Sequence, residues 1–323
     1  MANIANNLPR DLKDPKAKNL LGIGLTMEGL ETNPVVYDLM TEMAWHDSKV
    51  NLEDWIVKYT HRRYGKRNAK AEAAWKILLR TLYSCQTTRH GPQGSLYCMR
   101  PDFSNNGSFV RAEMWYKPAD VRKAFKLLLE ASDDLKDAQG YQYDLVDLGR
   151  QVMSDLSHEL HADIVKAYKA QNLAEFKKAR ARWLNAMKDT NTLLATNEMF
   201  LLGRWLQYAK NYGTTPAEKK HYEWNARDLI SCWGPKWCGL HDYAQRQYAG
   251  MMGDYYYNRW VLFFDHVEKL IKNKKRYNKR NFERVLVEYE NKWMHNQNKY
   301  RTTPTGNPVK AAENLKKHFS QEK

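Results

Sequence analysis

Apolar residues recur every three or four positions along most of this chain from residue 33 onward, which is the spacing of amphipathic helices. The longest stripe runs from Leu145 to Tyr168 and predicts one long helix. Asn33-Pro34 and the capping-box pattern at Thr215–Glu218 mark two helix starts, the second opening a helix towards Ile230. Further helices are predicted from Asn51, over about 69–83, from Pro118, and over about 173–201, 241–272, 278–296 and 308–319. The chain is therefore predicted to be mainly α-helical.

Two segments depart from this helical pattern. Leu20–Leu25 has the composition of a short β-strand, yet nothing else in the sequence offers it a strand partner. Because a lone strand cannot satisfy its backbone N–H and C=O groups, we interpret it as the end of a sheet whose other strands lie elsewhere. Residues 84–117 are rich in Gly, Pro, Ser and Asn and are predicted to form a long ordered loop, a feature that is often functional.

The composition is that of a globular protein with a substantial core. The 323 residues are 43% hydrophobic and 28% charged, which excludes disordered, collagen-like and disulfide-scaffold proteins. No apolar run approaches the ~18 residues that a transmembrane helix requires, so no membrane span is expected. Tyr (20) and Trp (11) outnumber Phe (9), a bias that suits half-exposed clefts as well as cores. The four cysteines leave the redox compartment open.

The net charge of +15 is partly concentrated in Lys269–Arg280. Such a basic segment could attract nucleic acid or an anionic polysaccharide. A solvated cationic face is favoured instead, because positive charge is stabilised at a helix C-terminus and no nucleic-acid-binding motif accompanies the segment. Nucleic acid is therefore not an expected partner.

Glu28 lies just past the carboxyl end of the predicted strand, within Leu20–Gly29. In α/β barrels the loops that leave the strands carry the catalytic groups, so a carboxylate here could act as a nucleophile or as a general acid or base. The simpler interpretation is that Glu28 places negative charge near the N-terminus of the helix that begins at Asn33. The local pattern alone favours the simpler interpretation.

A second cluster, Asp228–Pro235 followed by His241–Tyr248, places aromatic rings beside a reversal of the chain. Trp233 directly precedes Gly234-Pro235, so it lies where a helix must end and the chain must turn. The indole either faces a cleft, where its flat surface suits a pyranose ring, or fills a corner between helices. The local sequence leaves both readings open.

Histidines and cysteines give weaker signals. His90 lies in the predicted loop, where a histidine is more often exposed to solvent than functional. His158 and His161 lack the four-residue spacing of the metalloprotease zinc motif, so no metal site is predicted from them. Cys232 and Cys238 flank Trp233, and the sequence does not decide whether they oxidise or stay buried.

An ordered set of motifs resembles one enzyme family. Gly22–Tyr37 resembles the end of the catalytic barrel in α-N-acetylglucosaminidases, glycoside hydrolase family 89. The motifs that resemble the C-terminal α-helical domain of that family are Arg62–Gly65, Asp228–Pro235, Asp242–Gly250 and Asp254–Trp260. Because the motifs keep their order and a similar spacing across residues 20–260, the set is far more specific than any single member.

The resemblance implies a retaining mechanism in which two carboxylates flank the glycosidic bond, about 5–5.5 Å apart. Glu28 occupies the position of the family's nucleophile. His90 and Tyr243 fall where the helical domain forms hydrogen bonds with sugar hydroxyls, and Trp233 falls where an aromatic ring stacks on the sugar or walls it. The resemblance implies no metal or organic cofactor, since carboxylate chemistry suffices.

The resemblance also implies a domain organisation. We expect residues 1–46 to be the C-terminal remnant of the catalytic (β/α) barrel and residues 47–323 to be the α-helical C-terminal domain. The expected fold is thus mainly α, a helical bundle preceded by the last strand and helix of an incomplete TIM-like barrel. The family's acid/base glutamate and most of its barrel correspond to sequence upstream of this chain.

The expected function is that of the C-terminal portion of an exo-glycosidase that removes terminal α-linked N-acetylglucosamine from glycans. Its expected partners are such a glycan and the upstream barrel, supplied by the same parent protein or by a separate chain. Alone, the chain is expected to be inactive. The alternative is a non-catalytic helical module that binds carbohydrate or docks to a barrel. Family members are typically exported or lysosomal, so the lack of a signal peptide does not indicate the cytosol.

Overall fold

The computed structural model describes residues 1–26, 33–85, 95–104, 114–237 and 240–319. The chain divides into two compact units, one formed by Met1–Arg89 and Met114–Leu148, the other by His90–Glu113 and Gly149–Lys323. Helices are the regular structure of the described residues, and the backbone bridge between Leu201 and Ala249 is isolated. The prediction of a mainly α fold is confirmed. Within the described ranges, no helix combines the length and the apolar character that crossing a membrane requires.

The first unit is an array of helices, several of which begin at an asparagine. Its elements are α1 (Ala2–Leu12), η1 (Pro15–Ala17), α2 (Pro34–Glu42), η2 (Met43–Trp45), α3 (Leu52–Tyr64), α4 (Ala69–Arg80), α5 (Pro118–Glu130), α6 (Ser132–Leu135) and the first part of α7 (Gln139–Lys169). The side chains of Asn33, Asn51 and Asn68 accept hydrogen bonds from first-turn N–H groups of α2, α3 and α4. These caps satisfy donors that a helix start otherwise leaves unpaired.

Asp144, near the start of α7, joins three elements of the first unit. Its carboxylate accepts hydrogen bonds from Arg63 Nε at 2.5 Å, from Tyr64 Oη at 2.9 Å and from Asn33 Nδ2 at 3.1 Å. Burial raises the pKa of Asp144, and the guanidinium of Arg63 opposes that shift. Because Asn33 caps α2 and the other two donors end α3, one carboxylate holds the ends of both helices against α7.

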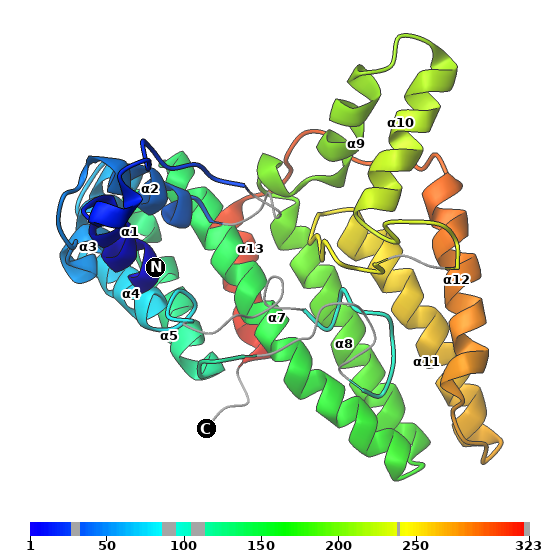
Figure 1. Ribbon diagram of the computed structural model, residues 1–323. Coiled ribbons are helices and arrows are strands. Elements are labelled where there is room, and N and C mark those ends of the chain that lie inside the picture. The colour runs from blue at the N-terminus through cyan, green and yellow to red at the C-terminus, as the bar shows by residue number, and fades with distance from the viewer. Residues whose placement is uncertain (27–32, 86–94, 105–113, 238–239, 320–323) are drawn as a thin grey trace. The chain divides into compact units, whose positions relative to one another are not determined.

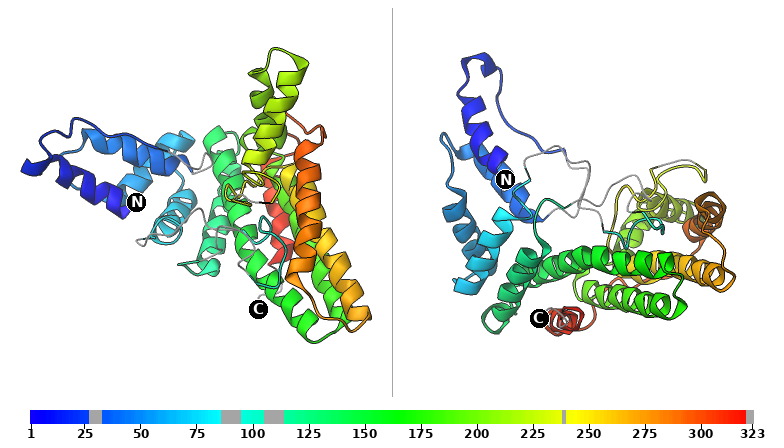
Figure 2. Two further views of the ribbon diagram at one scale, coloured as in Figure 1. Left: turned by 45° about the vertical axis from the view of Figure 1, so that its right-hand side comes forward. Right: turned by 90° about the horizontal axis from the view of Figure 1, so that it is seen from below.

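The second unit is a bundle of long helices with a projecting hairpin. Besides the rest of α7, it contains α8 (Leu173–Leu194), η3 (Glu198–Phe200), α9 (Leu202–Asn211), α10 (Pro216–Leu229), the π-helical η4 (Met251–Tyr256), α11 (Tyr257–Lys272), α12 (Lys279–His295), α13 (Pro308–Asn314) and η5 (Leu315–His318). α11 packs against α8 and α12, while α9 and α10 form a hairpin that extends from one end of the bundle (Figure 1 and Figure 2).

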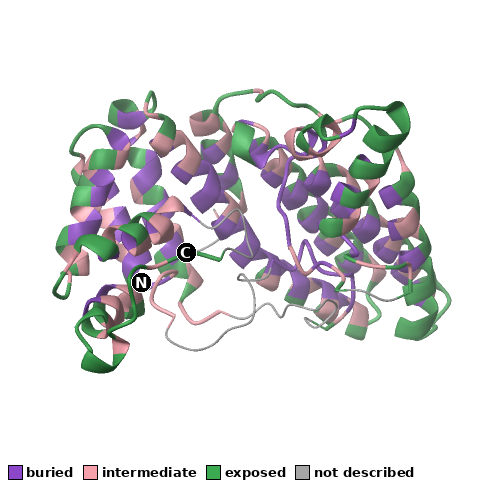
Figure 3. Ribbon diagram, turned by 45° about the horizontal axis from the view of Figure 1, so that its top comes forward, coloured by how far each residue is buried: buried purple, intermediate pink, exposed green. Residues whose placement is uncertain are grey.

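Aromatic rings fill the centre of the second unit. Trp183 of α8 and Trp260 of α11 are buried, and their ring centroids lie 4.2 Å apart. Trp260 donates a hydrogen bond from Nε1 to the carbonyl of Tyr97 at 3.0 Å, so the polar atom of this indole is satisfied. In Figure 3 buried and exposed residues alternate around the helices, as the amphipathic pattern predicts.

Two sequence predictions near the N-terminus differ from the structure. Residues 20–26 belong to no strand, because the described residues offer them no pairing partner. Ala2–Leu12 forms α1, a helix that was not among the predicted ones, and Pro9 lies inside it. The described parts of the predicted loop, residues 84–85, 95–104 and 114–117, contain no helix, in agreement with the prediction.

The predicted helix over 241–272 is wrong in its first ten residues. Residues 241–250 are not helical, and regular structure resumes only at Met251. Asp242 and Gln245 have φ values of +57° and +44°, a left-handed conformation that a right-handed helix cannot contain. The helix predicted over 173–201 ends at Leu194, and the other predicted helices are confirmed with ends moved by a few residues.

Replacing Asp144 by alanine is expected to destabilise the first unit by about 3–5 kcal/mol, because the mostly buried Arg63 loses its carboxylate. Hydrogen exchange followed by mass spectrometry should then show faster exchange in α2 and α3. D134A is the control, since Asp134 is exposed, lies 3.8 Å from Lys66 and should contribute less than about 1 kcal/mol. Unchanged protection of α2 and α3 in D144A would contradict the assignment.

Candidate functional site

Two of the four candidate site residues fall in the described part of the chain. Trp233 and Tyr243 lie in the second unit with ring centroids 4.9 Å apart and an interplanar angle of 67°. Trp233 is 37% exposed and Tyr243 is half-buried, so this ring pair presents apolar surface to solvent. Glu28 and His90 lie outside the described residues. The structure therefore brings two of the candidates together. The role of Glu28 as nucleophile and the sugar-binding role of the other three residues stay predictions.

Trp233 occupies a strained turn just after the end of α10. Its φ is +46°, a left-handed conformation that costs roughly 1–3 kcal/mol for a residue with a side chain. Asp228 holds this turn twice. Its carbonyl accepts a hydrogen bond from Trp233 N at 2.7 Å, and its Oδ1 accepts one from Gly234 N at 3.1 Å. The end of α10 thus fixes the backbone that carries the partly exposed indole.

Tyr243 is positioned by the residue that precedes it. Asp242 N donates a hydrogen bond to the carbonyl of Ser231 at 2.7 Å, and the Asp242 carboxylate pairs with Arg259 at 3.0 Å. Asp242 and Arg259 are both fully buried. The bond to Ser231 ties the segment carrying Tyr243 to the turn carrying Trp233, which explains why the two rings meet.

Four buried charges support this segment, and we refer to Arg100, Asp242, Arg259 and Glu290 as the charge network. Glu290 of α12 accepts hydrogen bonds from Arg259 at 2.9 Å and from Arg100 at 2.5 Å. Burial alone would lower the pKa of Arg259 and raise that of Glu290. The opposite charges reverse both effects, so the pKa of Arg259 is raised and that of Glu290 is lowered. Both groups therefore stay ionised inside the unit.

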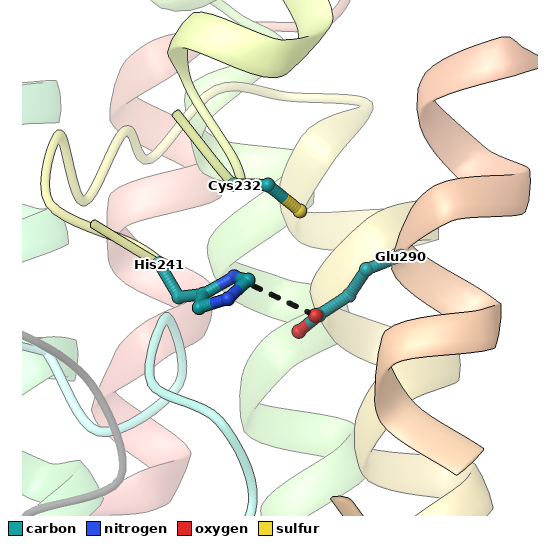
Figure 4. A group of neighbouring side chains, drawn as sticks. All are labelled: Cys232, His241 and Glu290. Carbon is teal, nitrogen blue, oxygen red and sulfur yellow. Dashed lines mark ion pairs between the residues drawn. The ribbon is translucent and has the colours of Figure 1, made fainter. Parts of the chain in front are cut away.

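Cys232, His241 and Glu290 form a group whose potential metal-ligand atoms all lie within 4.8 Å of one another (Figure 4). A metal would need the thiol as thiolate and a carboxylate free to coordinate. Burial raises the pKa of Cys232 to about 12, and Glu290 already accepts bonds from both guanidiniums of the charge network. A metal cation would also face Arg100 and Arg259. The donor set does not fit a metal, and we assign the group a structural role.

The sequence did not point to the charge network as a whole. Arg259 lies inside Asp254–Trp260 and Asp242 begins Asp242–Gly250, two motifs that the family resemblance had singled out. Arg100 and Glu290 carry no comparable signal, because they lie 190 positions apart and each has the appearance of an ordinary surface charge. Only their burial in the folded unit distinguishes them.

Two family models match this chain, one over most of its length and one at its N-terminal end. The family model "Alpha-N-acetylglucosaminidase (NAGLU) C-terminal domain" matches residues 55–318 of the chain. The model "Alpha-N-acetylglucosaminidase (NAGLU) tim-barrel domain" matches residues 1–47. The ring pair and the charge network both lie within the range that matches the C-terminal domain.

Individual relatives give the same correspondence. Human α-N-acetylglucosaminidase is 31% identical over 299 residues, which cover 92% of this chain and 39% of the human protein. A family 89 glycoside hydrolase from Clostridium perfringens, solved with 2-acetamido-1,2-dideoxynojirimycin, is 28% identical with a TM-score of 0.89, and the match covers 98% of this chain and 37% of that one.

A further Clostridium perfringens structure is a variant with two glutamates replaced by glutamine, in complex with its substrate GlcNAc-α-1,4-galactose. It is 27% identical with a TM-score of 0.90, and the match covers 98% of this chain and 37% of that one. The chain therefore spans less than two-fifths of the length of these relatives.

Replacing Asp242 by asparagine keeps the shape of the side chain but removes one of the two carboxylates that face Arg259. We expect a loss of about 3 kcal/mol in the stability of the second unit. The near-UV circular dichroism of the Trp233–Tyr243 pair should weaken as well. E288Q is the matched control, because Glu288 pairs with Lys236 on the surface at 2.7 Å. Equal stability of D242N and E288Q would contradict a supporting role for the charge network.

The stability of the second unit is expected to fall as the pH drops from about 6.5 to about 4. Burial and the charge of Arg100 lower the pKa of His241 to about 4, whereas an unfolded histidine titrates near ~6.5. In this window the unfolded chain binds a proton that the folded chain does not, so stability rises with pH. Allowing for solvent screening, the effect should be on the order of 1–2 kcal/mol.

Urea unfolding at pH 7 and at pH 4.5 measures this contribution, with H241Q as the comparison. The variant should lose less stability than the wild-type chain between these pH values. Glu290 has its pKa lowered and contributes its own loss only below its unfolded value of ~4.5, so it does not mimic the effect. Identical losses in both proteins would refute the role of His241.

Proposed function

Because the chain belongs to the α-N-acetylglucosaminidase family, glycoside hydrolase family 89, we propose that it forms part of a retaining exo-glycosidase. In this proposal residues 1–46 complete the catalytic barrel and residues 47–323 form the helical C-terminal domain. The enzyme removes terminal α-linked N-acetylglucosamine from glycans, and the barrel that completes it comes from the same parent protein or from a separate chain.

The observation that carries the proposal is the Trp233–Tyr243 ring pair, which lies on two family motifs and is held in place by buried groups. A half-exposed indole offers a flat apolar surface for a pyranose ring, and a phenol adds a group that forms hydrogen bonds with hydroxyls. The Clostridium perfringens relative bound to GlcNAc-α-1,4-galactose supports a sugar of this class as the ligand.

Glu28 is the proposed nucleophile, attacking the anomeric carbon to form a glycosyl-enzyme that water then hydrolyses. The second carboxylate protonates the leaving oxygen and later activates that water, and we assign it to the upstream barrel. The relative that was trapped with its substrate after two glutamate-to-glutamine replacements supports a pair of glutamates. Such chemistry requires no metal and no organic cofactor.

The helical C-terminal domain, residues 47–323, then supplies the walls of the sugar pocket. Trp233 stacks on the sugar or walls it, while Tyr243 and His90 form hydrogen bonds with its hydroxyls. Positioning of this kind contributes to rate because it holds the anomeric carbon in line with the nucleophile. In this proposal the helical C-terminal domain contributes to catalysis although it carries neither of the two carboxylates.

The chain alone is expected to show negligible turnover of an aryl α-N-acetylglucosaminide. In this proposal the second carboxylate lies outside the 323 residues, and acid–base catalysis alone is typically worth ~10²–10⁴ in rate. A colorimetric assay of the purified chain, with E28Q as the control for contaminating activity, measures this. Robust turnover that E28Q abolishes would overturn the proposal that the second carboxylate lies elsewhere.

A chimera tests the site residues directly. The part of the Clostridium perfringens enzyme that this chain matches is replaced by residues 1–323, so that the rest of its barrel is kept. We expect turnover of GlcNAc-α-1,4-galactose, reduced roughly 10³-fold or more by E28Q. W233A and Y243F should each lower kcat/KM by about 10–100-fold through lost substrate contacts.

Y212F is the control for Y243F, because Tyr212 is 79% exposed on the α9–α10 hairpin and should not affect turnover. An active chimera in which W233A and Y243F behave like Y212F would reject the ring pair as part of the pocket. A folded chimera that binds the disaccharide without turning it over would favour the non-catalytic carbohydrate-binding module instead.

A further inference from the structure

A cleft of about 410 Å³ opens on the second unit between α12 and the segment that follows the Trp233 turn. Its lining combines basic, aromatic and acidic side chains from elements far apart in the sequence. The residues that concern its chemistry are Arg280, Glu283 and Arg284 of α12, together with Trp237, His241 and Arg100. Trp237 lies on the same segment as the ring pair, but the ring pair does not line this cleft.

Arg280 and Arg284 are one helical turn apart on α12, and both are exposed. Side chains at this spacing are neighbours, with Cβ atoms about 5–6 Å apart. Among the described residues, neither arginine has a carboxylate within ion-pair distance. A planar guanidinium can donate two parallel hydrogen bonds to the oxygens of a carboxylate or a sulfate. The two neighbouring side chains can therefore bind one anion together.

Apart from Glu283, the other charges of the cleft are balanced or absent. Glu283 lies 3.4 Å from Arg100, whose guanidinium also pairs with Glu290. Lys236, next to the cleft, pairs with Glu288 at 2.7 Å. His241 is uncharged near neutral pH because its pKa is lowered to about 4. Because the charge network is neutral by itself, Glu283 offsets part of the charge of Arg280 and Arg284. These two exposed arginines still carry the excess positive charge of the cleft.

Trp237 adds an apolar surface beside these arginines. Its side chain is 66% exposed, so the indole contributes little to the core of the unit. A free anion such as inorganic sulfate would gain no apolar contact from the indole. An uncharged sugar would form no ion pair with the arginines. A ring that has an apolar face and carries an anionic group satisfies both features.

We infer that this cleft binds an anionic sugar, a pyranose bearing a sulfate or a carboxylate. Arg280 and Arg284 hold the anionic group, and Trp237 packs against the ring. The choice of a sugar rests on the proposed function, whereas the anion contacts follow from the cleft alone. The site is separate from the Trp233–Tyr243 pair and provides a second point of attachment for an acidic glycan.

Ligand-observed NMR titrations of the 323-residue chain at low ionic strength test this inference. The probes are glucose 6-sulfate, glucuronate, glucose and inorganic sulfate. We expect at least one of the two anionic sugars to bind at least about fivefold more tightly than glucose and than inorganic sulfate. Comparison of the first two probes identifies which anionic group is preferred.

The R280Q/R284Q variant should weaken binding of the anionic sugars about tenfold or more, and W237A should weaken it about fivefold. K177Q/K178Q is the matched control. It removes the same amount of charge from exposed positions on α8, in the same unit, and should leave binding nearly unchanged. Circular dichroism verifies that each variant is folded.

Several outcomes would overturn the inference. Equal losses in R280Q/R284Q and K177Q/K178Q would mean that net charge, and not the cleft, attracts the ligand. Inorganic sulfate binding as tightly as glucose 6-sulfate, or no effect of W237A, would reject the sugar. Because binding is measured without turnover, these results are independent of the chimera assay that tests the proposed function.

Discussion

The second unit depends on one interaction above the others, the pairing of Arg259 with two buried carboxylates. Moving a guanidinium out of water costs several kcal/mol, and only well-placed opposite charges offset that cost. Asp242 and Glu290 provide them at 3.0 and 2.9 Å, and Arg100 balances the second carboxylate. Two cations thus face two anions. The charge network links α11, α12 and both non-helical segments that contribute to it.

This constraint explains the conformation of the segment that carries the candidate site. A helix through residues 241–250 would turn Asp242 away from Arg259, leaving a buried guanidinium with one carboxylate fewer. The chain instead accepts left-handed backbone at Trp233, Asp242 and Gln245. Each such residue costs of order 1–3 kcal/mol, which is comparable to the penalty for breaking a buried pair. The same irregular backbone presents Trp233 and Tyr243 to solvent.

The sequence predicts those elements whose conformation is determined by residues close together in the chain. Helices with an asparagine or threonine cap were predicted because the cap and the apolar stripe lie within a few residues of each other. The non-helical conformation of residues 241–250 was not predicted, because it depends on partners on α11 and α12. Trp233 and Tyr243 became site candidates through the family motifs, because periodicity alone left a corner-filling role equally open. Their contact needed the folded chain.

The charge network also determines what the neighbouring cleft can attract. Arg100 lines that cleft, but its charge is balanced by Glu290, and the adjacent His241 stays neutral near neutral pH. Attraction for an anion is therefore left to the two arginines on the exposed face of α12. Trp233 and Trp237, only four positions apart, consequently lie in different electrostatic surroundings. In the two proposals, one segment therefore offers an aromatic surface to an uncharged sugar at the first indole and to an acidic sugar at the second.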